Sequence, residues 1–453
     1  MRIPKIAVVT LGCAKNLADT DLLAGQILNQ GIAIAADPSE ADAIIVNTCA
    51  FLTASQRESI DTILEMAEHK RVRPGRRLIV VGCLAQRHGG DLMREIPEID
   101  MIVGPGEVHS LAPRLRSLLD EGPDGDRIHL GGFDRVEERW DLRVVSQLSH
   151  SAYVKISEGC DRTCAFCVIP ALRGPHRSRS LESIVEEARR LAGSGVRELN
   201  LVAQELTAWG ADLDGKPSLP RLLEALNEVE GVRWIRLLYA YPSPWTADLI
   251  RCFRDLPRLA PYLDMPIQHV SERILRRMRR PPFGSTVRLL ERFRAEVPGI
   301  ALRTTLISGF PGETQEEHEE MLAFVRSFGF DHLGVFAYST EEGTVAGAME
   351  GQLPLRLREQ RRRGILAAQR EASVRRHVAW KGRRVEVLLD RSEKPGVWVG
   401  RHAGQAPEVD GVTRLRAGDG WSPRAGEFVE AEVVSAGPYD LSARPVARPG
   451  ERP

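Results

Sequence analysis

The chain has 453 residues, enough for two to four domains of ordinary size. Hydrophobic residues make up 43% of it and charged residues 27%, as in an ordinary globular protein, and equal numbers of basic and acidic residues (62 each) favour no class of partner. We find no signal peptide and no apolar run long enough to cross a bilayer, and seven cysteines in so long a chain exclude a secreted disulfide framework, so we expect a cytoplasmic protein without a membrane partner.

Residues 1–105 repeat a strand–loop–helix unit. Apolar strands are predicted at residues 5–11, 43–46, 77–81 and 101–104, with helical periodicity at 19–30 and 55–69. Strands that alternate with helices indicate a parallel, flavodoxin-like sheet. Residues 106–150 follow as a domain connector.

A cysteine lies just past the end of each of the first three strands: Cys13, Cys49 and Cys83. The carboxyl ends of such strands share one sheet edge, where ligands bind, so the three thiols can converge. The alternative is three unrelated buried cysteines, because free Cys is a common core residue. The same position in three consecutive units favours a metal cluster with three protein ligands.

Strand–helix alternation resumes over residues 151–353. Six strands are predicted, which suffice for a partial barrel with its active site at their carboxyl ends: 153–157, 198–202, 234–238, 262–266, 301–307 and 332–338. Later strand ends carry polar or glycine-rich motifs on the same rim, at 204–205, 268–269, 308–313 and 338–344. The plain alternative for each motif is a turn followed by a helix cap. Cys252 stands apart and is predicted to be a buried apolar residue.

Three more cysteines, Cys160, Cys164 and Cys167, follow the first barrel strand at C-x3-C-x2-C spacing. Thiolates suit iron–sulfur clusters and zinc. Three thiolates leave one iron of a cubane cluster without a protein ligand. An open coordination position is typical of a catalytic metal site rather than of a structural one. A structural zinc site is the alternative, but zinc needs a fourth ligand, and the next histidine, His176, is nine residues beyond Cys167.

The C-terminal quarter contains a basic segment and a small β domain. Residues 354–384 favour a long helix with a solvated basic face, for which a charged surface helix is the first interpretation and a phosphate-binding role the second. Five short strands at 385–389, 397–400, 413–415, 428–436 and 439–441 predict a small antiparallel barrel, before a polar tail at 448–453. Ten acidic residues outnumber seven basic ones within 385–446, which suits a basic protein better than a nucleic acid.

Together these features resemble the methylthiotransferase family of radical S-adenosylmethionine (SAM) enzymes over nearly the whole chain. The C-x3-C-x2-C loop, with Phe166 before its last cysteine, resembles the radical SAM signature. Four segments resemble the branch that modifies a ribosomal protein (RimO type): 11–16 (LGCAKN), 155–160 (KISEGC), 169–174 (IPALRG) and 406–410 (APEVD). Glu205 and Trp209 depart from the Asp and Tyr expected in that branch, which leaves the substrate contacts open.

The resemblance implies a domain order and a cofactor set. A methylthiotransferase domain with an auxiliary 4Fe–4S cluster (1–105) and a connector (106–150) precede a radical SAM barrel (151–353), a basic helical linker (354–384) and an OB-like TRAM domain (385–447). Cys13, Cys49 and Cys83 would hold the auxiliary cluster, and Cys160, Cys164 and Cys167 the SAM-cleaving one. Candidate SAM contacts are Phe166, Glu205, Ser308 and Gly309.

The implied reaction adds a methylthio group to the β-carbon of an aspartate in small-subunit ribosomal protein twelve. One SAM methylates a sulfur, and a second yields a 5′-deoxyadenosyl radical that abstracts the hydrogen, a step that needs a cofactor. Implied partners are this basic protein, or the ribosomal subunit, and an electron donor such as flavodoxin or ferredoxin. Two alternatives are a tRNA adenosine methylthiotransferase (N6-isopentenyladenosine or threonylcarbamoyladenosine) and a non-catalytic iron–sulfur carrier or RNA-binding module.

Overall fold

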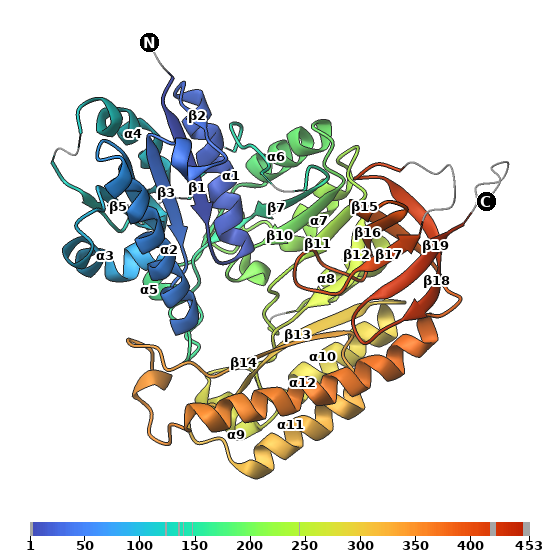
Figure 1. Ribbon diagram of the computed structural model, residues 1–453. Coiled ribbons are helices and arrows are strands. Elements are labelled where there is room, and N and C mark those ends of the chain that lie inside the picture. The colour runs from blue at the N-terminus through green and yellow to red at the C-terminus, as the bar shows by residue number, and fades with distance from the viewer. Residues whose placement is uncertain are drawn as a thin grey trace.

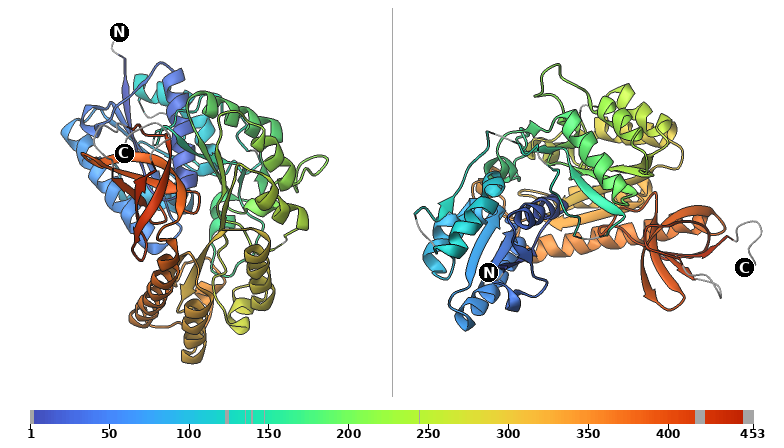
Figure 2. Two further views of the ribbon diagram at one scale, coloured as in Figure 1. Left: turned by 90° about the vertical axis from the view of Figure 1, so that its right-hand side faces the viewer. Right: turned by 90° about the horizontal axis from the view of Figure 1, so that it is seen from above.

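The computed structural model describes residues 3–122, 125–134, 136–138, 140–146, 148–243, 245–416 and 423–446; the predicted polar tail lies outside these ranges. Figure 1 shows an N-terminal α/β domain (blue), a parallel barrel (green to yellow) and a small β-barrel (red). A long helix, α12 (Leu355–His377), lies along the parallel barrel and leads to the small one. Figure 2 shows the N-terminal domain and the small barrel toward opposite ends of the molecule.

The N-terminal domain is a six-stranded parallel sheet in the order β2-β1-β3-β4-β5-β6. Its first five strands have the flavodoxin-like order, as the sequence predicts. Two helices cover each face, α1 with α4 and α2 with α3. The sixth strand comes from the predicted connector. The bounds are β1 (Lys5–Thr10), α1 (Ala14–Asn29), β2 (Ala33–Ile34), β3 (Ala43–Thr48), α2 (Thr53–Val72), β4 (Arg77–Gly82), α3 (Cys83–Glu95), β5 (Met101–Val103), α4 (Leu111–Asp120) and β6 (Ile128–His129).

The second domain is an open, six-stranded parallel sheet in the order β14-β13-β12-β11-β10-β7, which confirms the predicted partial barrel. Its core joins apolar strand residues to the helices between them. Cys252 is buried there, as predicted. The strands are β7 (Ser151–Lys155), β10 (Glu198–Val202), β11 (Trp234–Leu237), β12 (Leu259–Asp264), β13 (Ala301–Ser308) and β14 (His332–Ala337), with β8 (Ser157–Glu158) and β9 (Arg177–Ser178) paired separately. The helices are α5 (Ile169–Arg173), α6 (Leu181–Gly193), α7 (Leu219–Asn227), α8 (Ala247–Asp255), α9 (Glu272–Arg277), α10 (Phe283–Glu296) and α11 (Gln315–Phe328).

The basic segment forms the predicted helix α12, but its arginines are not all solvated. Arg358 is buried, and its guanidinium donates to the carbonyls of Leu353 and Tyr338 (2.6 and 3.0 Å). Arg361, also buried, forms an ion pair with Glu313 at 2.7 Å. These two arginines attach the helix to the rim of the parallel barrel, so part of its basic character is structural.

The C-terminal domain is a closed barrel in the order β15-β16-β17-β19-β18. The loop after β16 reaches into the parallel barrel: Ala406 belongs to an apolar cluster with residues of α1 and four barrel strands. Asp410 accepts a hydrogen bond from the Tyr262 hydroxyl at 2.7 Å. The APEVD segment (406–410) therefore docks the small barrel on the parallel barrel. The strands are β15 (Arg384–Lys394), β16 (Val397–His402), β17 (Thr413–Arg416), β18 (Phe428–Ala436) and β19 (Leu441–Pro445).

Within the described ranges, no helix is both long and apolar enough to cross a membrane.

Candidate iron–sulfur and S-adenosylmethionine sites

The first cysteine triplet lies at one edge of the N-terminal sheet. Cys13 precedes α1, Cys49 follows β3 and Cys83 opens α3, and the strands before them (β1, β3 and β4) are neighbours in the sheet. Gly12 has a left-handed backbone (φ +95°), and a Cβ there would lie 2.7 Å from the Cys49 Cβ. The close approach of these two loops therefore needs glycine.

The three thiols of this triplet interact electrostatically. Burial raises the pKa of Cys83 to about 11; nearby Arg173 acts in the opposite direction, and Cys13 and Cys49 add to the rise. Burial also raises the pKa of Cys49, again with a contribution from Cys13. Buried neutral thiols need a metal or a cation to become thiolates, and this triplet has a cation beside it.

That cation is Arg173, at the end of the helix that follows the second cysteine triplet. Its Nε donates to the Cys83 sulfur at 3.3 Å, and Nη2 donates to Asn16 Oδ1 at 2.6 Å. Nη1 forms ion pairs with Asp19 at 3.0 Å and Glu158 at 3.1 Å. Both carboxylates also bind the buried Lys155 ammonium, so the arginine is rigidly held. Sequence reasoning missed this contact, because the two partners are 90 residues apart.

The second triplet lies in the loop after β7 and β8. The amides of Arg162 and Ile169 donate to the sulfurs of Cys160 and Cys167, at 3.4 and 3.5 Å. Arg280 Nη1 lies 3.8 Å from the Cys164 sulfur. Burial raises the pKa of Cys160 to about 11 and of Cys167 to about 12.

Neither triplet is arranged around a single ion. Among the described residues, no group of three or more His, Cys, Asp or Glu side chains could hold one metal ion. A cubane cluster is larger, and each cysteine binds its own iron, so its three ligands stand farther apart than ligands of zinc. Soft sulfurs with N–H donors directed at them are ligands that fit such a cluster.

Two SAM candidates, Phe166 and Glu205, lie close to the second triplet. Phe166 packs on an apolar cluster that includes Ala165 and Tyr338. Glu205 is buried, accepts from the Arg162 Nε at 2.6 Å and from the Thr207 amide at 3.1 Å, and raises the pKa of Cys160. Its carboxylate already has protein partners, so it is suited to orient Arg162.

The other two candidates, Ser308 and Gly309, contact α12. The Ser308 hydroxyl donates to the Arg358 carbonyl at 3.1 Å, and a Cβ on Gly309 (φ +74°) would lie 2.6 Å from the Arg358 side chain. The Gly309 amide donates to Glu313 at 2.6 Å. Glu313 is buried and does not cap a helix, because α11 begins at Gln315 behind a capping box formed by Thr314. The motif at 308–313 is thus a turn followed by a helix cap, as the plain alternative has it, but the cap is Thr314, and Glu313 accepts hydrogen bonds from the turn instead of starting the helix.

One carboxylate of the barrel joins it to α2, which follows Cys49, and to α3, which begins at Cys83. Glu341, in the loop after β14, accepts from the amide of Thr53, which opens α2, and from Gln56 Nε2 at 3.0 Å. Arg87 of α3 forms an ion pair with it at 2.9 Å. The polar motif at 338–344 indicated that this loop belongs to the functional rim of the barrel. It did not predict which residues the loop contacts.

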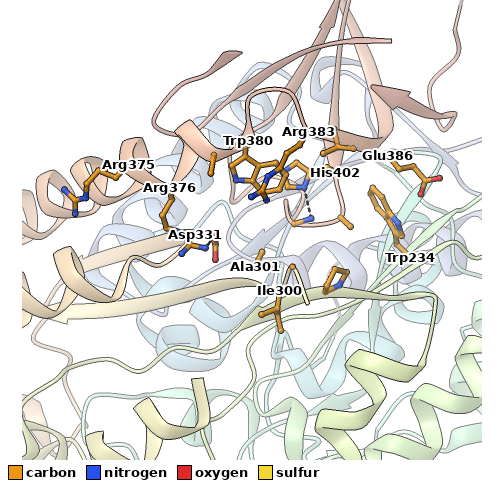
Figure 3. Close-up of a pocket in the computed structure, with 16 residues that line it drawn as sticks. Trp234, Ile300, Ala301, Asp331, Arg375, Arg376, Trp380, Arg383, Glu386 and His402 are labelled. Carbon is orange, nitrogen blue, oxygen red and sulfur yellow. Dashed lines mark hydrogen bonds and ion pairs between the residues drawn. The ribbon is translucent and has the colours of Figure 1, made fainter. Parts of the chain in front are cut away.

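A cavity of about 530 Å³ lies away from both triplets. Figure 3 shows that it is lined by the beginnings of barrel strands, by the end of α12 and by the small barrel, with Trp234, Ala301, Trp380 and His402 among the labelled residues. These strand beginnings are opposite to the cysteine-bearing rim, so the cavity is no part of the site described above.

Three family models match successive parts of the chain. Residues 5–104 match the uncharacterized protein family UPF0004, residues 154–325 the radical SAM superfamily and residues 382–446 the TRAM domain.

Relatives named ribosomal protein uS12 methylthiotransferase RimO match nearly the whole chain. The Anaeromyxobacter sp. (strain K) protein is 44% identical, over 99% of this chain and 94% of its own. The Symbiobacterium thermophilum protein is 46% identical, over 96% of this chain and 90% of its own. Among solved structures, the radical SAM methyltransferase TsrM from Kitasatospora setae has a similar fold (TM-score 0.55, 16% identity, 73% of this chain and 72% of that one).

Proposed function

The chain belongs to the RimO family of ribosomal protein uS12 methylthiotransferases, and we propose that its two cysteine triplets are the cluster ligands of that reaction. It is a radical SAM enzyme that uses SAM and two 4Fe–4S clusters to modify protein uS12. The tRNA reaction is not favoured, because these close relatives, matched over almost their full length, are named for the ribosomal protein.

In this proposal Cys160, Cys164 and Cys167 hold the SAM-cleaving cluster, and Cys13, Cys49 and Cys83 hold the auxiliary one. The observation that supports the second assignment is the interaction of three thiols at one sheet edge, with the Arg173 guanidinium on the Cys83 sulfur. When bound, the clusters supply the electron that cleaves SAM and the site for the transferred sulfur.

Side chains beside the second triplet are held in place to bind SAM. Arg162 is fixed by Glu205 and stacks on the Tyr241 ring, 4.2 Å from its centroid, and Arg280 stacks on the same ring at 4.1 Å. This fixed cationic pair beside Cys160 and Cys164 is suited to the carboxylate of SAM. Phe166, Ser308 and Gly309 remain candidates for SAM contacts, with Ser308 and Gly309 also required for docking α12.

We propose that the partners are uS12, free or within the small subunit, and a small electron-transfer protein such as flavodoxin or ferredoxin. The ribosomal substrate named for the relatives supports a cytoplasmic location for the reaction.

The proposal is tested with the reconstituted enzyme, SAM and a reductant, supplied with uS12, small subunits or tRNA in parallel. We expect a methylthio group on one aspartate of uS12, detected by mass spectrometry, and unchanged tRNA nucleosides. A methylthioadenosine in tRNA with unmodified uS12 would overturn the substrate assignment.

Two triple variants distinguish the roles of the two cysteine triplets. Replacing Cys160, Cys164 and Cys167 with Ala should abolish 5′-deoxyadenosine formation, whereas replacing Cys13, Cys49 and Cys83 should preserve it and abolish methylthio transfer. Each variant should retain about half of the iron of the wild type, because one cluster of two remains. A variant of the first triplet that keeps all its iron would show that the auxiliary ligands are elsewhere.

A further inference from the structure

The Lys15 ammonium lies where the cysteine edge of the N-terminal sheet meets the barrel. Lys15 follows Cys13 by two residues in the first turn of α1. Its Nζ lies 3.5 Å from the ring centroid of Tyr239. Tyr239 comes two residues after the carboxyl end of β11, with a left-handed backbone (φ +64°) that few non-glycine residues adopt.

Four cationic side chains interact with one of the six cysteines: Lys15 with Cys13, Arg162 with Cys160, Arg173 with Cys83 and Arg280 with Cys164. The three arginines are held by oxygen acceptors of the chain itself, which are the carboxylates of Glu205, Asp19 and Glu158 and the carbonyl of Pro266. Within the described ranges, the Lys15 ammonium lies over the Tyr239 ring and has no hydrogen bond or ion pair with an oxygen; the Glu158 carboxylate acts on it only at longer range. Arg162 and Arg280, proposed above for SAM, lie at the second triplet, so Lys15 is the cation at the first triplet that has no oxygen partner among the described residues.

The substrate presents such an anion next to the reacting atom. The carbon that receives the methylthio group carries the aspartate carboxylate, so a cation that binds the carboxylate also fixes that carbon. A charge-assisted hydrogen bond in a half-buried site is strong and directional, and a lysine is a compact charge on a flexible stem. The position beside Cys13 places this cation at the first triplet, where the proposed site for the transferred sulfur lies.

We propose that Lys15 binds the carboxylate of the target aspartate and selects for a carboxylate-bearing side chain. The inference rests on the proposed function, because it takes the first triplet as the auxiliary cluster. Lys15 is a specificity residue that contacts substrate, not a proton donor or acceptor.

Binding affinity measures this role without turnover. The holoenzyme is titrated with uS12, in whichever form the wild type modifies, and with the same substrate carrying Asn at the target position. We expect the wild type to prefer Asp to Asn by about tenfold, as for one hydrogen bond to a charged group. Lys15→Met should remove this preference, and Lys15→Arg should keep part of it. Lys381→Met, which changes an exposed lysine four residues beyond α12, is the matched control and should keep it in full.

Two further readouts separate binding from cluster assembly. Lys15→Met should raise the KM for uS12 by about tenfold while iron content and 5′-deoxyadenosine formation without uS12 stay at the wild-type level. Equal preference for Asp and Asn in the wild type, or an unchanged preference in Lys15→Met, would overturn the inference. Loss of iron in Lys15→Met would assign Lys15 to the cluster instead. Failure of the proposed function is distinct, because the wild type itself would then leave uS12 unmodified.

Discussion

The Glu341 carboxylate accepts a hydrogen bond from the Thr53 amide at 2.8 Å, across 288 positions of the chain. Leu52, the residue at the N-cap of α2, has no side chain that can cap a helix, and the barrel supplies the missing acceptor. A negative charge at a helix N-terminus is also favourable. Because α2 follows Cys49 closely and α3 begins at Cys83, this one carboxylate holds the helices next to two proposed cluster ligands.

Glu341→Ala should destabilise the protein and loosen the start of α2. The change leaves Arg87 as a half-buried cation without its carboxylate, and breaking such a pair typically costs roughly 3–5 kcal/mol. We expect a lower free energy of unfolding and faster hydrogen exchange at the amides of residues 53–56. Glu341→Gln, which keeps an acceptor, should lower the free energy of unfolding by less. Glu342→Gln, at the exposed neighbouring residue, is the control. Unchanged exchange at Thr53 in Glu341→Ala would contradict this account.

Arg173→Lys should weaken cluster binding by the first triplet. A lysine keeps the charge but cannot reach Cys83, Asn16 and two carboxylates together, as the guanidinium does. Loss of such an outer partner costs about 10- to 100-fold in metal affinity. The measurement is iron per chain after reconstitution, in a background where Cys160, Cys164 and Cys167 are Ala. The exposed Arg189→Lys on α6 is the control, and equal iron in both variants would contradict the prediction.

Local patterns in the sequence predicted the fold well. Alternating apolar strands and helices located both parallel sheets, and the cysteine positions followed from where strands end. Glu341–Thr53 and Arg173–Cys83 could not be predicted, because they join residues far apart in the chain through side-chain geometry that no local pattern encodes.

Charge patterns were a weaker guide, because they do not show which charges are buried. Arg358 and Arg361 of the basic segment dock α12 on the parallel barrel. Asp410 of the acidic domain accepts a hydrogen bond from Tyr262 within the chain. The ribosomal-protein assignment is supported by the relatives, more firmly than by the acidity of the small barrel.

Asp410→Asn should loosen the small barrel from the parallel one. Asp410 accepts from Tyr262, lies 3.3 Å from Arg303 and binds the Ala406 amide at 2.8 Å. Asn keeps the shape but loses the charge opposite a largely buried arginine, so we expect roughly 2 kcal/mol less stability. Urea unfolding and limited proteolysis after α12 are the measurements. Glu427→Gln, at an exposed carboxylate of the same domain, provides a control, and equal proteolysis of the two variants would contradict a docking role.

The stability of the protein should depend on pH through His402. Burial lowers the pKa of His402 from 6.5 to about 3, with further lowering by His332, Arg236 and His377. In the folded chain His402 Nδ1 accepts from the Gly404 amide at 3.0 Å, and its ring packs on Trp380, which suits the neutral form. Below pH 6.5 the unfolded chain takes up a proton that the folded chain does not. The free energy of unfolding therefore falls as the pH decreases toward 3, by up to about 1.4 kcal/mol per pH unit from this group.

His402→Asn removes the titrating ring but keeps an acceptor for the Gly404 amide. Its free energy of unfolding, measured by urea titration between pH 8 and pH 4.5, should fall less steeply below pH 6.5 than that of the wild type. The value at pH 8 reports the packing loss alone, because the ring is neutral there in both folded and unfolded chains. Parallel curves for the variant and the wild type across this range would mean that His402 does not exclude the proton in the folded state.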